Sequence, residues 1–84
     1  MSKPLFFTGK NCPACTIAKK YADEREIPYK LMDMDIRENA QTAAKFMVMG
    51  KPTLIVLDGK GHPQRSFHGS SCFSAYMKWK EQHK

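Results

Sequence analysis

The chain has 84 residues, of which 42% are hydrophobic and 26% charged, and its formal net charge is +6 at pH 7. This length predicts one small domain over residues 1–84, with enough apolar residues to fold without a structural metal. Three cysteines exclude a framework of several disulfides, and no apolar segment has the length of a signal-peptide core or a membrane span. We therefore expect a reducing, cytoplasmic compartment. We also expect a monomer.

The first predicted elements lie on either side of a Cys-x-x-Cys motif. The apolar segment Leu5–Phe7 is typical of a buried strand, and Thr8–Asn11 is typical of a turn that ends in a helix cap. Beyond it, apolar residues recur on one helix face at Ala14, Ile17, Ala18, Tyr21 and Ala22. This spacing predicts a helix with Cys12 in its first turn, ending at Ile27-Pro28.

The motif Cys12-Pro13-Ala14-Cys15 predicts a redox-active cysteine pair. Helical positions i and i+3 place their Cα atoms about 5 Å apart, a distance that a disulfide can span. Unpaired N–H groups and the macrodipole at a helix start stabilise a thiolate, so Cys12 is the predicted nucleophile, with Lys10 adding positive charge. Cys15, one turn further on, is the predicted resolving thiol. Pro13 fits the first turn and stiffens the loop between the sulfurs.

The middle of the chain predicts a strand and a second helix. Residues Tyr29–Met34 alternate in the manner of a strand, and Asp35 with Glu38 predicts a capping box. The helix that follows has an apolar stripe that ends at Gly50 and includes methionine expected in the core. The members of this stripe are Ala40, Ala43, Ala44, Met47 and Val48.

The last third predicts two strands and a third helix. The unbroken run Thr53–Leu57 indicates a central strand covered on both faces. After a turn at Asp58-Gly59, residues Gln64–Phe67 predict an antiparallel return strand. Ser70 or Ser71 can cap the last helix. Two faces of that helix fit about equally well: Phe73, Tyr76, Met77 and Lys80, or Cys72, Ala75, Tyr76 and Trp79.

This order of elements, with the cysteine pair after the first strand, resembles the thioredoxin fold in its smallest form, and specifically the glutaredoxins. The resemblance implies an α/β fold with a four-stranded mixed sheet flanked by three helices (βαβαββα). Lys51-Pro52-Thr53 takes the place of the family's cis-proline loop, where the backbone of Lys51 would bind an extended substrate strand and Thr53 would support it. Gly69-Ser70-Ser71-Cys72 partly resembles the segment that binds the γ-glutamyl carboxylate of glutathione.

The resemblance implies a dithiol–disulfide oxidoreductase with no bound cofactor and with glutathione as co-substrate. Its substrates would be disulfide-containing proteins, with ribonucleotide reductase as the family-level candidate. Some positions depart from the family: Ala14 stands where an aromatic residue is usual, and Lys51 stands where valine is usual. The turn at Leu57–Gly61 is more similar to thioredoxin. Electron supply from thioredoxin reductase is therefore the alternative to glutathione.

Three other functions compete with redox chemistry. A zinc module would use Cys12 and Cys15 with His68 and Cys72, near His62, although no compact finger spacing connects them. A glutathione-ligated iron–sulfur carrier is a further alternative. A nucleic-acid surface is disfavoured because the basic residues are scattered over Lys19-Lys20, Lys45, Lys51, Lys60, Arg65 and Lys78–Lys84. We expect Cys72 in the core or at a helix cap, and His62, His68 and His83 at the surface without a catalytic role.

Overall fold

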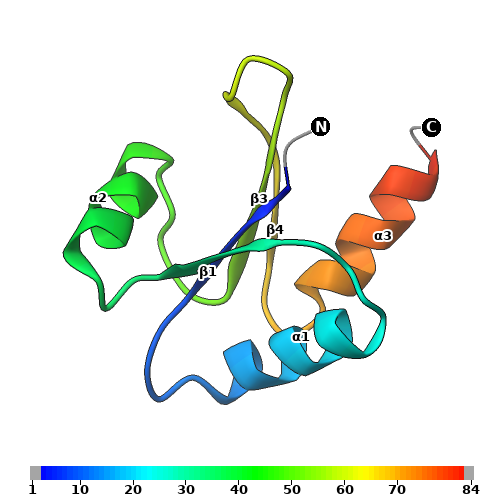
Figure 1. Cartoon of the computed structure of the whole chain (residues 1–84), viewed down its shortest axis with the longest axis horizontal. Coiled ribbons are helices and arrows are strands. Elements are labelled where there is room, and N and C mark those ends of the chain that lie inside the picture. The colour runs from blue at the N-terminus through cyan, green and yellow to red at the C-terminus, as the bar shows by residue number, and fades with distance from the viewer. Residues whose placement is uncertain (1–2, 83–84) are drawn as a thin grey trace.

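The computed structural model describes residues 3–82, so the expectations for His83 and for the end of the basic tail at Lys84 lie outside the described residues. Strands and helices follow one another in the predicted order, and together they form the expected α/β fold (Figure 1). The elements are β1 (Leu5–Thr8), α1 (Pro13–Glu24), β2 (Lys30–Asp33), α2 (Arg37–Lys45), β3 (Thr53–Leu57), β4 (Pro63–His68) and α3 (Cys72–Gln82).

The four strands form one mixed sheet in the order β2-β1-β3-β4. Strands β1 and β2 pair in parallel, so the chain must cross over between them, and α1 makes that crossover. Strand β3 pairs antiparallel with β1 on one side and with β4 on the other. Strands β1 and β3 are therefore the central ones, which confirms the prediction of a central strand at Thr53–Leu57 and of a buried strand at Leu5–Phe7.

Two hydrophobic clusters cover the two faces of the sheet. Successive side chains of a strand point to opposite faces, so Phe6 belongs to the cluster under α1 and α3, and Phe7 belongs to the cluster under α2. Both phenyl rings are fully buried. In the larger cluster the ring of Phe6 lies 5.0 Å from that of Phe73 and 5.5 Å from that of Tyr29, measured between centroids. Aromatic contacts thus hold α3 and the residue just before β2 against strand β1.

Helix α1 differs in three details from the prediction. Cys12 is the N-cap residue rather than a member of the first turn, and the helix ends at Glu24, before Ile27-Pro28. Its buried residues are Cys15, Ala18 and Ala22, whereas the side chain of Ile17 is 58% exposed. The early end has a local cause: Glu26 adopts a left-handed φ of 54°, and the N–H of Ile27 then donates to the carbonyl of Ala22.

Helix α2 corrects two further predictions. Its N-cap is Ile36 and no side chain caps it, so Asp35 and Glu38 do not form a capping box. The helix ends at Lys45, and Met47, expected in the core, is 81% exposed. Met47 has a left-handed φ of 59°, which turns the chain away from the helix axis and directs this side chain to solvent. The buried residue of the helix is Ala43.

Helix α3 combines the two faces that the sequence offered. Cys72, Phe73 and Tyr76 are buried, Trp79 is half-buried, and Met77 is 38% exposed. The expectation for Cys72 as a core residue is confirmed. Within residues 3–82, no helix is long and apolar enough to cross a membrane.

Candidate active site

The site lies at one end of the sheet, where four segments meet. The strand register pairs Thr8 with Asp33, Phe7 with Thr53, and Thr53 with His68. The last residues of β1, β2 and β4 therefore lie at the same end as the first residue of β3. Consequently residues 9–12, 34–36, 50–52 and 69–71 are brought together although they are far apart in the sequence.

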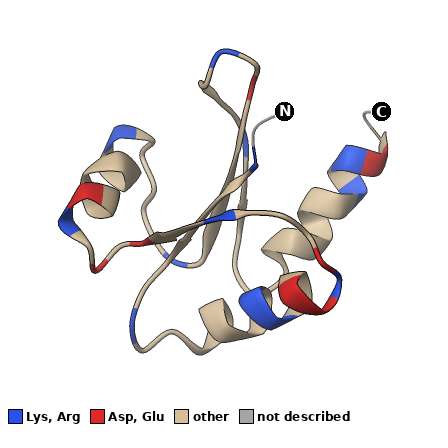
Figure 2. Cartoon of the chain, viewed as in Figure 1, with Lys and Arg blue, Asp and Glu red and all other residues tan. Residues whose placement is uncertain are grey.

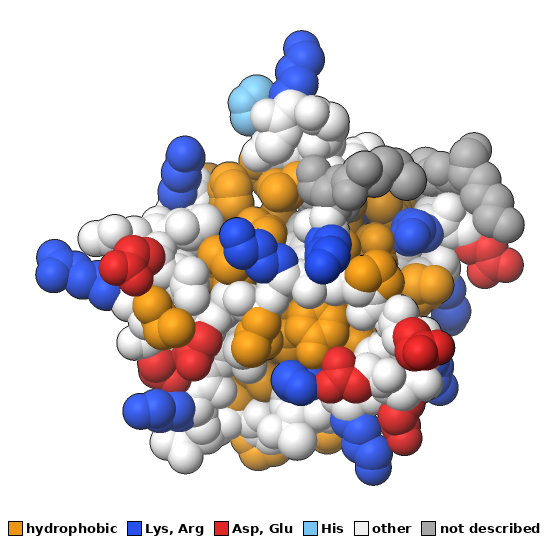
Figure 3. All heavy atoms as spheres, viewed as in Figure 1, with side chains coloured by type: hydrophobic (Ala, Val, Ile, Leu, Met, Phe, Trp, Pro, Cys, Tyr) orange, Lys and Arg blue, Asp and Glu red, His pale blue; other side chains and the backbone are white. Residues whose placement is uncertain are grey.

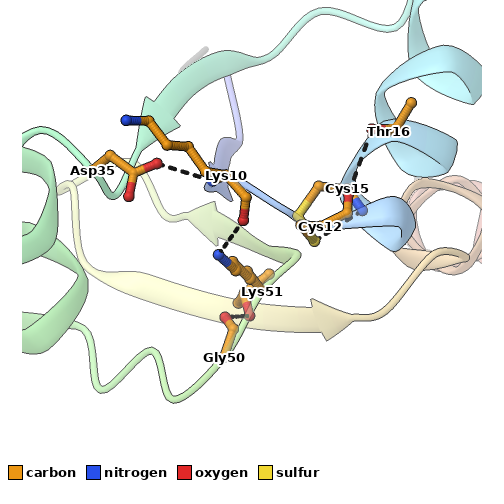
Figure 4. Close-up of a disulfide and its surroundings, with 8 residues drawn as sticks. Lys10, Cys12, Cys15, Thr16, Asp35, Gly50 and Lys51 are labelled. Atoms are coloured by element: carbon orange, nitrogen blue, oxygen red, sulfur yellow. Dashed lines mark hydrogen bonds between the residues drawn. A yellow bond between two sulfur atoms is a disulfide. The ribbon is translucent and has the colours of Figure 1, made fainter.

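The two cysteines of the motif form a disulfide at the start of α1 (Figure 4). Their Cα atoms are 5.2 Å apart, and the Sγ of Cys12 accepts a 3.1 Å hydrogen bond from the N–H of Cys15. Cys12 is partly exposed, whereas Cys15 is buried. Pro13 occupies the first helical position, and no residue of the first turn is acidic. The accessible sulfur thus lies at the end of a helix where N–H groups favour a negative charge.

The loop before β3 lies next to the segment that leads into α3. The peptide bond between Lys51 and Pro52 is cis, as the family resemblance implies. The carbonyl of the buried Pro52 accepts a 3.0 Å hydrogen bond from the N–H of Gly69. Ser70 and Ser71 follow in the exposed turn before α3. The structure therefore joins the two segments that the sequence singled out for substrate binding.

Thr53 anchors the same loop from inside the sheet. Its side chain is 1% exposed, and its hydroxyl donates to the carbonyl of Gly50 at 2.8 Å. The Nδ1 atom of His68, an exposed residue of β4, lies 3.2 Å from the same hydroxyl oxygen. Thr53 thus fixes the chain just before Lys51, and its expected support of a bound substrate stays a prediction.

Lys10 is held from both sides by residues of two other loops. Its N–H donates to a carboxylate oxygen of Asp35 at 2.9 Å, and its carbonyl accepts from the Nζ of Lys51 at 2.7 Å. Figure 4 shows these two contacts on either side of Lys10, with the disulfide next to Lys51. Asn11, the next residue, has a left-handed φ of 53°. Sequence reasoning missed Asp35 as a site residue, because its position before a helix favours a cap.

Within residues 3–82, the zinc and nucleic-acid alternatives find no comparable grouping of residues. Within residues 3–82, no group of three or more His, Cys, Asp or Glu side chains could hold a metal ion. Cys72 is buried, and desolvation raises the pKa of its thiol to about 11. Lysines and arginines are distributed over helices, strands and loops (Figure 2).

Hydrophobic side chains are also exposed on the face shown in Figure 3. A shallow hollow of about 470 Å³ lies at the end of the sheet opposite to Cys12, because its lining includes the first residues of β1 and β2 and the last residue of β3. The hollow is lined by Lys3, Leu5, Tyr29, Lys30 and Leu57. It takes no part in the cysteine site.

Solved thioredoxin structures are similar to this chain over most of its length. A thioredoxin from Fasciola hepatica is 27% identical, with a TM-score of 0.69 over 96% of this chain and 79% of its own. Thioredoxin 1 from Thermosipho africanus is 21% identical, with a TM-score of 0.60 over 95% and 99%. A thioredoxin from Thermus thermophilus is 20% identical, with a TM-score of 0.66 over 94% and 70%. The sequence matches no protein-family model and no curated protein.

The fold and the site together define a thioredoxin-fold protein with a Cys-x-x-Cys redox motif. This combination supports a thiol–disulfide redox function. The three structures named above are thioredoxins, and the likeness does not distinguish a glutaredoxin type from a thioredoxin type.

Proposed function

We propose that this chain is a dithiol–disulfide oxidoreductase that reduces protein disulfides or mixed disulfides with glutathione. The observation that carries the proposal is the disulfide between a partly exposed N-cap cysteine and a buried cysteine one turn further on. This asymmetry gives each sulfur a separate role. Cys12 is accessible to an incoming disulfide, and Cys15 is reached only from within the protein.

In the reduced protein, the thiolate of Cys12 attacks one sulfur of the target disulfide, and the other target sulfur leaves as a thiolate. The thiolate of Cys15 then attacks the Cys12 sulfur in the mixed disulfide and expels the second target sulfur. The Cys12–Cys15 disulfide forms and the target gains two electrons. Its two thiolates take up one proton that the Cys15 thiol releases and one from water. The N–H of Cys15, which bonds to the Cys12 sulfur in the oxidised form, is a donor available to the Cys12 thiolate.

Substrate is proposed to bind across the loop before β3. The N–H and C=O groups of Lys51 would pair with an extended substrate strand. The backbone at Gly69, Ser70 and Ser71 would take a carboxylate of glutathione at the start of α3. Glutathione or thioredoxin reductase would return the protein to the dithiol state. By family resemblance, ribonucleotide reductase is the proposed protein substrate, and the cytoplasm is the proposed compartment for a monomer.

A coupled assay with a disulfide substrate tests the proposal and identifies the reductant. One arm supplies glutathione with its reductase, and the other supplies thioredoxin reductase. We expect Cys12→Ser to abolish turnover. Cys15→Ser is expected either to accumulate a mixed disulfide, seen as added mass on the intact protein, or to keep part of a glutathione-dependent activity.

Cys72→Ala serves as the matched control, because it removes the free, buried thiol that is not part of the Cys12–Cys15 disulfide and leaves the backbone at the start of α3 in place. Its activity should stay close to that of the unmodified protein. Retention of full activity in Cys12→Ser would contradict the assignment of the nucleophile. Inactivity of the unmodified protein with both reductants would contradict the proposed function.

A further inference from the structure

The side chain of Lys51 occupies a defined place beside the redox disulfide. It folds back over the β1–α1 loop, and its Nζ donates to the carbonyl of Lys10. Gly9 makes room for it, since a Cβ atom at Gly9 would lie 2.9 Å from the Nζ and 3.1 Å from the Cδ of Lys51. A side chain at position 9 would therefore displace this ammonium group.

Within residues 3–82, no carboxylate forms an ion pair with this ammonium group. Within residues 3–82, the one ion pair joins Lys19 to Asp23, at the far end of α1 from the disulfide. The nearby carboxylate of Asp35 accepts from the backbone of Lys10 on the other side of that residue. Lys51 is exposed, and its single hydrogen bond to Lys10 leaves two further N–H donors. The cysteine site thus presents an unpaired positive charge to an incoming substrate.

We propose that Lys51 selects disulfide substrates that carry an acidic residue next to the reactive cysteine. This inference rests on the proposed function, because the backbone of Lys51 is where the substrate strand would pair. A substrate residue beside the attacked cysteine would then pass close to the Lys51 ammonium group. The chain's formal charge of +6 favours the same class of acidic partner over longer distances.

Single-turnover reduction of matched peptide disulfides tests the proposal without any added reductase. The prereduced protein is mixed with symmetric disulfides of end-blocked peptides in which the cysteine is flanked on both sides by glutamate or by glutamine. Each rate is divided by the rate of the same peptide with dithiothreitol, which corrects for the intrinsic reactivity of the peptide. The corrected glutamate-to-glutamine ratio is the measure of preference.

We expect this ratio to be about twofold to fivefold at low salt, the range of an exposed ion pair, and to approach one in 1 M salt. Lys51→Gln should bring the ratio close to one, and Lys51→Arg should preserve it. Gly9→Ala keeps the charge but displaces the ammonium group, so it should lower the ratio. Lys60→Gln makes the same change of net charge in the β3–β4 turn and should leave the ratio unchanged.

Equal ratios for the unmodified protein and Lys51→Gln would overturn the inference while leaving the proposed function standing. Absence of reduction with every peptide would overturn both. Oxidised glutathione is a further arm, because it also carries carboxylates close to its disulfide. If Lys51→Gln slowed the reduction of glutathione disulfide alone, the carboxylate of glutathione would be the recognised group, and selection of acidic protein segments would be refuted.

Discussion

Replacing Cys72 by alanine tests how far burial controls the thiol chemistry of this chain. Cys72 is fully buried, and desolvation of its charged form raises the pKa of this thiol from 9.0 to about 11. The folded protein keeps the proton at a pH at which the unfolded chain has lost it. The stability due to this group is therefore complete below pH 9.0 and is lost as the pH rises toward 11. Linkage predicts a loss of about 2 kcal/mol between roughly pH 8.5 and 10.5.

The measurement is urea unfolding at both pH values in a background that carries Cys12→Ser and Cys15→Ser, so that disulfide exchange cannot interfere. The same background with Cys72→Ala is the control. Burial raises the pKa of Tyr29, and the hydrogen bond to Asp23 raises the pKa of Lys19, so both groups also weaken the fold at high pH. Their effects cancel in the comparison. If both proteins lost the same free energy of unfolding, the Cys72 thiol would ionise equally easily in the folded and unfolded states.

Three further substitutions test the core, the site loop and the surface. Phe73→Ala removes a fully buried ring and should lower the free energy of unfolding by about 3–5 kcal/mol in urea, whereas a loss below ~1 kcal/mol would contradict its place in the core. Thr53→Val removes the hydrogen bond to Gly50; it should cost about 1 kcal/mol and speed amide hydrogen exchange at residues 50 and 51. Lys19→Gln breaks the half-exposed ion pair with Asp23, and its effect should stay below about 1 kcal/mol and disappear in 1 M salt.

The elements of the fold could be predicted because their signals are local. Apolar runs predict a buried strand at Leu5–Phe7 and a central strand at Thr53–Leu57, and both strands are confirmed. Helix faces were less well determined, since a stripe at helical spacing is defined only to within about one position. In α1 the buried stripe passes through Cys15 rather than Ile17. That small rotation matters for the site, because it shields the second sulfur of the motif.

Element ends were missed where a residue other than glycine adopts a left-handed conformation. Glu26 and Met47 follow the first two helices in this conformation, and Asn11 adopts it in the loop just before the redox disulfide. A glycine after a helix is a recognisable signal for the left-handed conformation that ends it, whereas glutamate and methionine at these positions give no such signal in the sequence. Met47 was therefore assigned to the core although the chain turns it outward.

In the candidate active site, too, the feature set by neighbouring residues could be predicted from the sequence, whereas the contacts between distant residues could not. The cysteine pair needs only one helical turn, so its spacing alone predicts that the sulfurs meet. The contacts that hold Lys10 join it to residues 25 and 41 positions away, and no periodicity reports such distances. The parallel register explains the first of them. Thr8 pairs with Asp33, so Lys10 and Asp35 each lie two residues beyond the same pair, and a slip of one residue would present a hydrophobic side chain instead.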